Sequence, residues 1–190
     1  MALIVIEGID GCGKETQIKL LKEAFPDLVV FKYPTANYQL LNDYLAKKAE
    51  IDPKALFLLF LSDIANEQKK IKEALDAGKT VVLDRYVFST VAYDLNSLFY
   101  PQAKKIVEGI GFIKPNISIL LDIPSDVSQE RKRKQKQLDR YEENKEYLTK
   151  VRESFLRLYE ENFLSEKWVK LDASRPVEAV HKSVMAALKQ

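Results

Sequence analysis

A glycine-rich turn near the N-terminus stands between a short apolar run, residues 2–6, and a segment with helical spacing of apolar residues. The turn, residues 8–14, reads GIDGCGK and has the G-x-x-x-x-G-K spacing of a phosphate-binding loop, or P-loop. Its glycines let backbone N–H groups curl around an anion, and the helix that follows directs its positive end at the same point. Because the motif lies at a strand-to-helix junction, it predicts an α/β fold and nucleotide binding. A turn that merely joins a strand to a helix is the alternative.

One position of this loop departs from the motif. Glu15 follows Lys14 where a Ser or Thr normally contacts magnesium. A carboxylate beside phosphates is repelled unless it points away or reaches magnesium through water. Glu15 is therefore either a tolerated variation or a sign of a damaged catalytic site.

Length and composition narrow the class of protein. The 190 residues fit a single domain, 1–190, with 46% hydrophobic and 31% charged residues. A net charge of +2 argues against a protein that coats nucleic acid. No apolar run approaches the roughly 20 residues of a membrane span, and no secretion signal opens the sequence. The one cysteine excludes an internal disulfide, so a cytoplasmic enzyme is the expectation.

Short apolar runs alternate with longer segments of helical period, the pattern of a parallel sheet covered by helices on both faces. The expected strands are Leu3–Glu7, Leu28–Lys32, Thr80–Asp84, Ile117–Asp122 and Trp168–Leu171. The expected helices are Lys14–Ala24, Tyr38–Lys48, Lys54–Ala77, Ser89–Leu98, Gln102–Gly109, Ser125–Gln137, Glu143–Phe163 and Val177–Lys189. Ligands of such sheets bind beyond the carboxyl ends of the strands, so the charged strand ends should meet at the site. Those ends are Glu7, Lys32, Asp84 and Asp122, of which Asp122 either caps the next helix or faces the ligand.

The third expected helix begins with residues 55–61, ALFLLFL, which are apolar all round. Such a segment is covered by the core, by a partner subunit or by both. The sequence favours the core.

Two further clusters point to phosphoryl chemistry. Asp84 and Arg85 close the third strand, where an Asp can hold magnesium through water and an Arg can clamp a phosphate. The alternative for this cluster is an ion pair that ends the strand. Residues 131–140 contain six basic side chains, which can bind nucleic acid, form a solvated helix face, or close over a nucleotide as a lid. No aromatic residue interleaves the basic run, so a lid at about 131–142 is favoured over nucleic-acid binding.

With these clusters in view, the chain resembles the thymidylate kinase family, whose members transfer the γ-phosphoryl group of ATP to dTMP. The matching residues are Glu7-Gly8-Ile9-Asp10-Gly11, Gly13-Lys14, Thr16-Gln17, Tyr33-Pro34, Asp84-Arg85-Tyr86, Ser89, Ala92-Tyr93, Leu121-Asp122, Asp139-Arg140-Tyr141-Glu142 and Asp172-Ala173-Ser174. They run in the family's order from end to end. The resemblance implies a three-layer P-loop kinase fold with a five-stranded parallel sheet, Mg²⁺ as cofactor, ATP as donor and a homodimer.

The resemblance also implies roles for particular residues. Those expected to bind ATP are Gly8, Gly11, Cys12, Gly13, Lys14, Glu15, Thr16, Ser174 and Arg175. Those expected to bind the acceptor are Asp10, Tyr33, Pro34, Phe60, Arg85, Ser89, Thr90 and Tyr93. Asp84 and Asp10 are expected near the metal, and Asp10, Lys14 and Arg85 are expected to be catalytic. Because the loop carries Gly at position 11, the helping arginine should come from the lid, as Arg131, Arg133 or Arg140.

Two positions leave the acceptor base open. Ile64 stands where the family usually places an arginine on the thymine O4, and Ala36 where some relatives bind the acceptor phosphate. Asn37 or Asn66 is a possible substitute. A kinase for dUMP, dGMP or a deoxynucleoside therefore remains an alternative, as does a nucleotide-binding regulator that has lost catalysis. A nucleic-acid-binding module resting on the basic run is a third.

Overall fold

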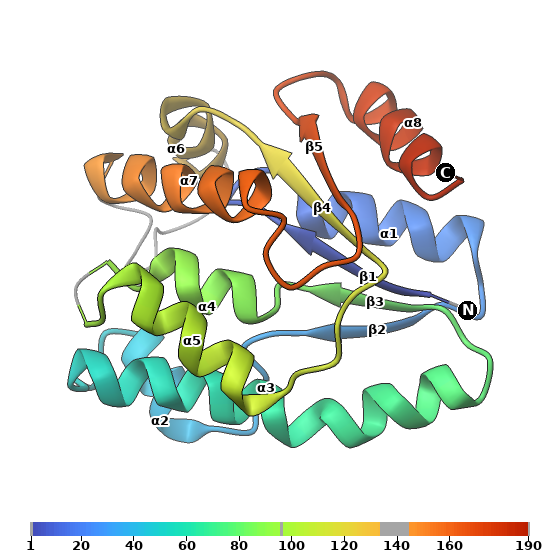
Figure 1. The fold of residues 1–190 in the computed structure, drawn as a ribbon. Coiled ribbons are helices and arrows are strands. Elements are labelled where there is room, and N and C mark those ends of the chain that lie inside the picture. The colour runs from blue at the N-terminus through green and yellow to red at the C-terminus, as the bar shows by residue number, and fades with distance from the viewer. Residues whose placement is uncertain (1, 96, 134–144, 190) are drawn as a thin grey trace.

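The computed structural model describes residues 2–95, 97–133 and 145–189. Within them the strands form one parallel sheet in the order β2-β3-β1-β4-β5 (Figure 1). The strands are β1 (Leu3–Glu7), β2 (Val29–Lys32), β3 (Val81–Asp84), β4 (Ile117–Asp122) and β5 (Trp168–Asp172). This arrangement confirms the predicted fold class.

Helices cover both faces of the sheet (Figure 1). They are α1 (Lys14–Ala24), α2 (Gln39–Leu45), α3 (Pro53–Asp76), α4 (Val87–Tyr93), α5 (Tyr100–Ile110), α6 (Ser125–Arg133), α7 (Lys145–Glu160) and α8 (Val177–Ala187). Helices α1 and α8 pack together on one face, and α3, α4 and α7 pack on the other. Across the described ranges, no helix is both long and apolar enough to cross a bilayer.

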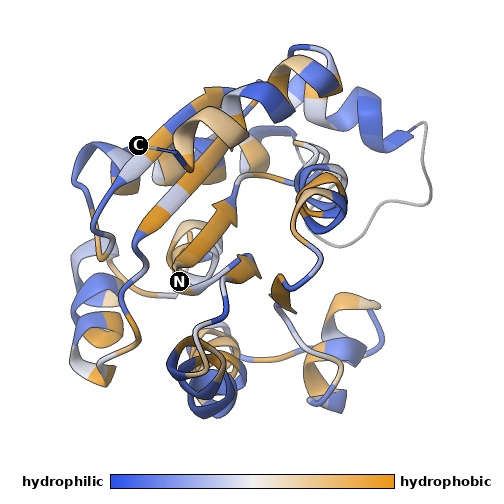
Figure 2. Cartoon of the chain, turned by 90° about the vertical axis from the view of Figure 1, so that its right-hand side faces the viewer, coloured by the Kyte–Doolittle hydropathy of each residue, from blue (hydrophilic) through white to orange (hydrophobic). Residues whose placement is uncertain are grey.

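The central strands are apolar because helices bury both of their faces. Every residue of β1 is buried, and Val5 pairs in register with Leu83 of β3 and Ser118 of β4. The strands accordingly form a hydrophobic interior under helices whose outer faces are hydrophilic (Figure 2). All strands point the same way, so their carboxyl ends gather at one edge, where the P-loop begins.

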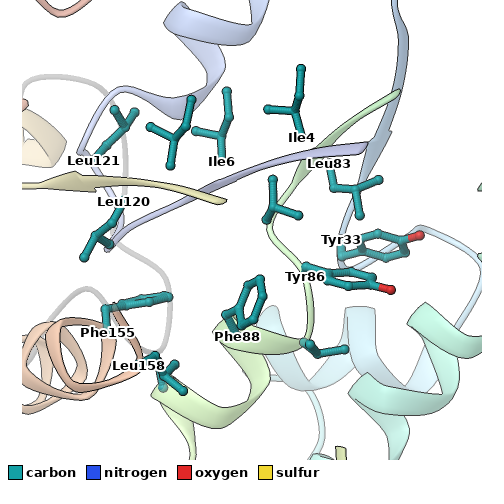
Figure 3. Close-up of a cluster of buried hydrophobic side chains, with 14 of the residues drawn as sticks. Ile4, Ile6, Tyr33, Leu83, Tyr86, Phe88, Leu120, Leu121, Phe155 and Leu158 are labelled. Carbon is teal, nitrogen blue, oxygen red and sulfur yellow. The ribbon is translucent and has the colours of Figure 1, made fainter. Parts of the chain in front are cut away.

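A buried aromatic cluster fixes the junction of β3 with α4 (Figure 3). Tyr86 is fully buried, and its ring centroid lies 6.0 Å from that of Phe88 in an edge-on contact. The Tyr86 hydroxyl lies 3.0 Å from both Gln68 Oε1 and the Ile113 carbonyl oxygen. Because Tyr86 directly follows Arg85, this packing holds the backbone that presents the arginine.

The largest difference from the predicted elements is at α4. This helix covers Val87–Tyr93, whereas the sequence predicted Ser89–Leu98. The backbone leaves the helix at Asp94, whose carboxylate accepts hydrogen bonds from the backbone N–H and the hydroxyl of Ser97. Such local side-chain bonds compete with helix continuation. The predicted helix end at Gln137 and helix start at Glu143 lie outside the described residues.

The apolar segment 55–61 divides its side chains between three environments. Leu56, Phe57 and Leu61 are buried in the core, which confirms the favoured interpretation for them. Phe60 is half-buried and lines the cavity described below. Leu58 is 54% exposed, so the core does not account for it.

Candidate active site

The P-loop follows β1 and packs so tightly that two of its glycines have no room for a side chain. A Cβ on Gly8 would lie 2.5 Å from the carbonyl oxygen of Leu121 in β4. A Cβ on Gly11 would lie 2.9 Å from the carbonyl oxygen of Ser128 in α6. Both residues also have positive φ, at +141° and +75°. The loop is therefore held against β4 and α6 by close backbone contacts that only glycine allows.

Lys14 begins α1 and folds back over the loop. Its ammonium donates to the carbonyl oxygens of Gly8 at 2.8 Å and Ile9 at 3.2 Å, and the residue is 7% exposed. Cys12, 2% exposed, lies beneath it, with Sγ 3.6 Å from the ammonium. This arrangement keeps one positive charge in the cradle formed by the loop.

Glu15 occupies the first turn of α1, with a side chain 77% exposed. Its carboxylate accepts a hydrogen bond from the ammonium of Lys32, the last residue of β2. This bond and the charge of Lys32 lower the pKa of Glu15. The Lys32 ammonium also lies 3.9 Å from Asp84 Oδ2. The irregular P-loop residue is thus one half of an ion pair. Thr16, which follows it, is exposed.

Arg85 and Asp10 form the charged centre of the site. The Arg85 guanidinium donates to Asp10 Oδ1 at 2.5 Å and to the hydroxyl of Ser89 at 3.1 Å. Tyr93 donates its hydroxyl to Asp10 Oδ2 at 2.7 Å, and the guanidinium lies 5.2 Å from the centre of its ring. Burial alone would raise the pKa of Asp10, but Arg85, Lys14 and the Tyr93 hydroxyl together hold it well below its usual range. Asp10 is therefore an ionised anchor for the guanidinium.

The backbone of Arg85 is itself unusual. Its φ is +71°, a left-handed conformation that costs a non-glycine residue on the order of 1 kcal/mol. The neighbouring buried Tyr86 and the bonds of Arg85 to Asp10 and Ser89 hold it there. Strain of this kind gathers at functional sites, which agrees with the role predicted for Arg85.

Glu7 was predicted only as one of the charged strand ends that meet at the site, with no role of its own, and the structure gives it one. It is fully buried at the end of β1, and its carboxylate accepts from the backbone N–H of Tyr86 at 2.8 Å. It also accepts from the N–H of Ser89 at 3.2 Å and from the Ser89 hydroxyl at 2.6 Å. Glu7 thereby satisfies the N-terminus of α4. Its charge at the end of an otherwise apolar strand was the available signal.

Glu7 gives the protein a pH-dependent stability. Burial raises the pKa of Glu7 to about 7, against the opposing charge of Arg85. The ordinary pKa of this carboxyl is 4.5, so between pH 4.5 and pH 7 the folded protein binds more protons than the unfolded chain. The contribution of Glu7 to the free energy of unfolding therefore falls as pH rises. Substituting Glu7→Gln should remove this loss, because the amide stays neutral and its oxygen still accepts from Tyr86.

We expect the free energy of unfolding of the Glu7→Gln variant, relative to the unsubstituted protein, to rise by about 2.5 kcal/mol from pH 5 to pH 8. Urea denaturation at both pH values measures the difference. Glu108→Gln, on the exposed side of α5, is the matched control and should show a difference below about 0.5 kcal/mol. A flat difference for Glu7→Gln would show that the buried carboxylate does not titrate in this range.

A cavity of about 250 Å³ opens beside Arg85, between α3 and α4. All of the residues predicted to bind the acceptor line it: Asp10, Tyr33, Pro34, Phe60, Arg85, Ser89, Thr90 and Tyr93. They come from the P-loop, the segment after β2, helix α3, the junction of β3 with α4, and helix α4. The fold therefore brings together eight positions that lie far apart in the sequence.

Of the positions that depart from the family pattern at the acceptor base, only one lies in the cavity wall. Ile64, 2% exposed, forms part of the wall and is apolar. Ala36, Asn37 and Asn66 are exposed and do not line the cavity. The structure therefore gives no support to Asn37 or Asn66 as replacements for the missing arginine. Asp63 also lines the wall, and its carboxylate accepts from the backbone N–H of Thr35 at 2.7 Å.

The metal-binding capacity of the site rests on Asp84. Its Oδ1 atom is buried and has no hydrogen-bond partner among the described residues. A free carboxylate oxygen beside a phosphate loop fits Mg²⁺, which is commonly held by one or two carboxylates together with substrate phosphates and water. No group of three or more His, Cys, Asp or Glu in the described ranges could hold a metal ion by itself.

Helix α6 brings the first part of the predicted lid against the P-loop. Arg131 donates to the carbonyl oxygens of Gly11 at 3.4 Å, Ala173 at 3.0 Å and Ser174 at 3.3 Å, so it bridges the loop and the segment after β5. Arg133 is exposed at the end of α6, and Arg140 lies outside the described residues.

The segment after β5 is shaped by a local turn. The backbone N–H and the hydroxyl of Ser174 both donate to Asp172 Oδ1, at 2.9 and 2.5 Å. Arg175 is exposed beside it. At the end of β4, Asp122 forms a two-pronged ion pair with Arg152 of α7, at 2.6 and 2.9 Å. Asp122 therefore does not line the cavity, and its carboxylate pairs with α7 instead.

A parallel sheet with a P-loop after β1, and a cavity lined by charged residues at the carboxyl ends of its strands, define a P-loop kinase fold. The sequence model of the family described as "Thymidylate kinase" matches residues 6–184. The chain belongs to the thymidylate kinase family.

Individual relatives agree with this assignment. The chain is 34% identical to a thymidylate kinase of Chlamydia abortus, over 97% of this chain and 93% of that protein. It is 36% identical to a probable thymidylate kinase of Archaeoglobus fulgidus, over 96% and 92% of the two chains. The solved structure of a thymidylate kinase from Candida albicans has the same fold, with a TM-score of 0.80 and 24% identity, covering 99% of this chain and 91% of that one.

Proposed function

We propose that this protein transfers the γ-phosphoryl group of ATP to dTMP, forming dTDP. The observation that carries the proposal is the cavity beside the P-loop, which is lined by all of the predicted acceptor-binding residues and bounded by Arg85. Membership of the thymidylate kinase family supports the same reaction. The ATP phosphates would lie on the loop at the N-terminus of α1, and the acceptor phosphate at Arg85.

The mechanism follows from where the charges are. Phosphoryl transfer needs positioning and positive charge more than covalent chemistry. Arg85, anchored by Asp10, would orient the acceptor phosphate, and Lys14 would neutralise charge on the moving group. Asp84 would hold Mg²⁺, which would supply further positive charge to the phosphates. The remaining charge would come from the predicted lid at about 131–142, in which Arg131, Arg133 and Arg140 carry the guanidinium groups.

The cavity suits a deoxynucleotide base. Phe60 offers an aromatic face at its wall, and Ile64 and Thr90 extend the lining. Tyr93 lines the cavity, and its ring would exclude a ribose 2′-hydroxyl. Because its hydroxyl is held by Asp10 at 2.7 Å, the ring has a fixed direction. The apolar Ile64 gives no donor to the thymine O4, so base selection would rest on shape and stacking.

The test is turnover of a panel of acceptors with Mg-ATP. We expect kcat/KM for dTMP to exceed that for dUMP by about tenfold, since one methyl group in an apolar pocket discriminates to that degree. The panel also includes dGMP and thymidine. Preference for one of these would establish the alternative acceptor, which Ile64 and Ala36 leave open. Binding of ATP without turnover of any acceptor would identify a catalytically impaired regulator instead.

Assembly and location are part of the same proposal. A homodimer is supported by Leu58, which is 54% exposed on α3 beside buried Leu56 and Phe57. An apolar side chain in that position is readily covered by a second copy. Sedimentation equilibrium tests this, and a monomer at all concentrations contradicts it. We also propose that the enzyme acts in the cytoplasm.

A further inference from the structure

The carboxylate of Glu15 is held at one edge of the P-loop by a lysine from another strand. Lys32 ends β2 and Asp84 ends β3, and the two residues are paired in register in the sheet. The Lys32 ammonium therefore projects from the strand ends toward α1, where it meets Glu15. The second contact, 3.9 Å to Asp84 Oδ2, gives it a negative neighbour on each side.

The position of residue 15 in the chain places its carboxylate where it would repel a bound phosphate. Glu15 directly follows Lys14, so its side chain starts beside the place where a P-loop holds the outer phosphates. A free carboxylate there would repel a polyphosphate that carries three or four negative charges. Bonded to Lys32, the carboxylate has both a partner of opposite charge and a fixed direction. Lys132 and Lys14 contribute smaller attractions to the same carboxylate.

We propose that Lys32 is a positioning residue for ATP binding: it holds the Glu15 carboxylate aside and cancels its charge, so that the Glu15–Lys32 ion pair replaces the hydroxyl usual at this position. The inference rests on the proposed function only in taking ATP as the ligand. Lys32 acts through Glu15, so its importance depends on which residue stands at position 15. A lysine that contacted phosphate directly would have no such dependence.

A double-mutant cycle on ATP binding tests this dependence. The dissociation constant of ATP is measured by calorimetry for the unsubstituted protein, Lys32→Met, Glu15→Gln and the double variant, in excess Mg²⁺ and in EDTA. We expect Lys32→Met to weaken binding about tenfold in EDTA, where no metal shields the phosphates, and less in Mg²⁺. Glu15→Gln should change affinity by threefold or less alone, yet recover most of the tenfold loss in the Lys32→Met background.

Two further variants test whether the effect depends on a cation at position 32 or on the total charge of the protein. Lys32→Arg keeps a cation that reaches Glu15 and should retain affinity within about threefold. Lys22→Met removes one exposed positive charge from the far end of α1 and should leave the ATP dissociation constant within twofold. Melting temperatures should agree for all variants, because Lys32 and Glu15 are 59% and 77% exposed.

The outcomes distinguish the inference from the proposed function. Equal effects of Glu15→Gln in the two backgrounds would overturn the inference, since the residues would not act as a pair. A loss in Lys32→Met that Glu15→Gln cannot recover would overturn it as well, because Lys32 would then act through Asp84 or on phosphate directly and not through Glu15. Failure of the unsubstituted protein to bind ATP would overturn the proposed function together with the inference.

Discussion

Substituting Lys14→Met should lower kcat for dTMP phosphorylation about 1,000-fold while changing the KM for dTMP by less than threefold. The Lys14 side chain folds back over the P-loop, and its ammonium donates to the carbonyl oxygens of Gly8 and Ile9. Removing a preorganised donor that acts on developing charge costs about 100- to 1,000-fold in kcat. Methionine preserves the length of the buried stem, so the loop keeps its packing. Steady-state kinetics with both substrates varied separates the two constants.

Lys19→Met is the control for this prediction, because Lys19 is exposed on the same helix and its substitution also removes one positive charge. Its kcat should stay within twofold of the unsubstituted protein. Small and similar effects of the two substitutions would contradict the role of Lys14. So would a large rise in KM for dTMP without a change in kcat, which would place Lys14 on the acceptor instead of the transferring group.

The elements of the fold were predictable because their signals are local. The apolar runs Leu3–Glu7 and Ile117–Asp122 became β1 and β4 with the predicted bounds, since strands buried on both faces need continuous apolar sequence. Helix α1 also has its predicted bounds, which the P-loop and the helical spacing set together. The end of α4 was missed because a side-chain bond from Asp94 decided it.

The sequence named the residues that line the cavity, through the resemblance, but not the contacts between them. Those contacts join residues far apart in the chain. Glu7 bonds to Ser89, and Arg131 reaches the carbonyl oxygen of Ser174. The sequence marks Glu15 as a departure from the P-loop motif and Lys32 as a charged strand end, but nothing in it pairs the two. Only the parallel pairing of β2 with β3 places Lys32 between Glu15 and Asp84, and no sequence period encodes that distance.

Among the residues of the site, we expect Arg85 to have the largest effect on acceptor binding. Substituting Arg85→Met should raise the KM for dTMP about 100-fold, because a guanidinium binds a phosphate through two parallel hydrogen bonds. Arg85→Lys keeps the charge without the fork, so we expect a rise of about tenfold. The dissociation constant of ATP without acceptor should change less than twofold in both variants. Acceptor titrations at saturating Mg-ATP and calorimetry with ATP alone provide the two measurements.

The complication is Asp10, because removing Arg85 leaves this largely buried carboxylate without the guanidinium that holds its pKa low. An unpaired buried charge is destabilising by about 3 kcal/mol, and the loss of binding could then reflect a disturbed site. The double variant Asp10→Asn/Arg85→Met removes both charges and should regain thermal stability. If the rise in KM comes from lost phosphate binding, the double variant stays at least as impaired toward dTMP as Arg85→Met alone. Recovery of KM along with stability would show that Arg85 supports the site without gripping the acceptor.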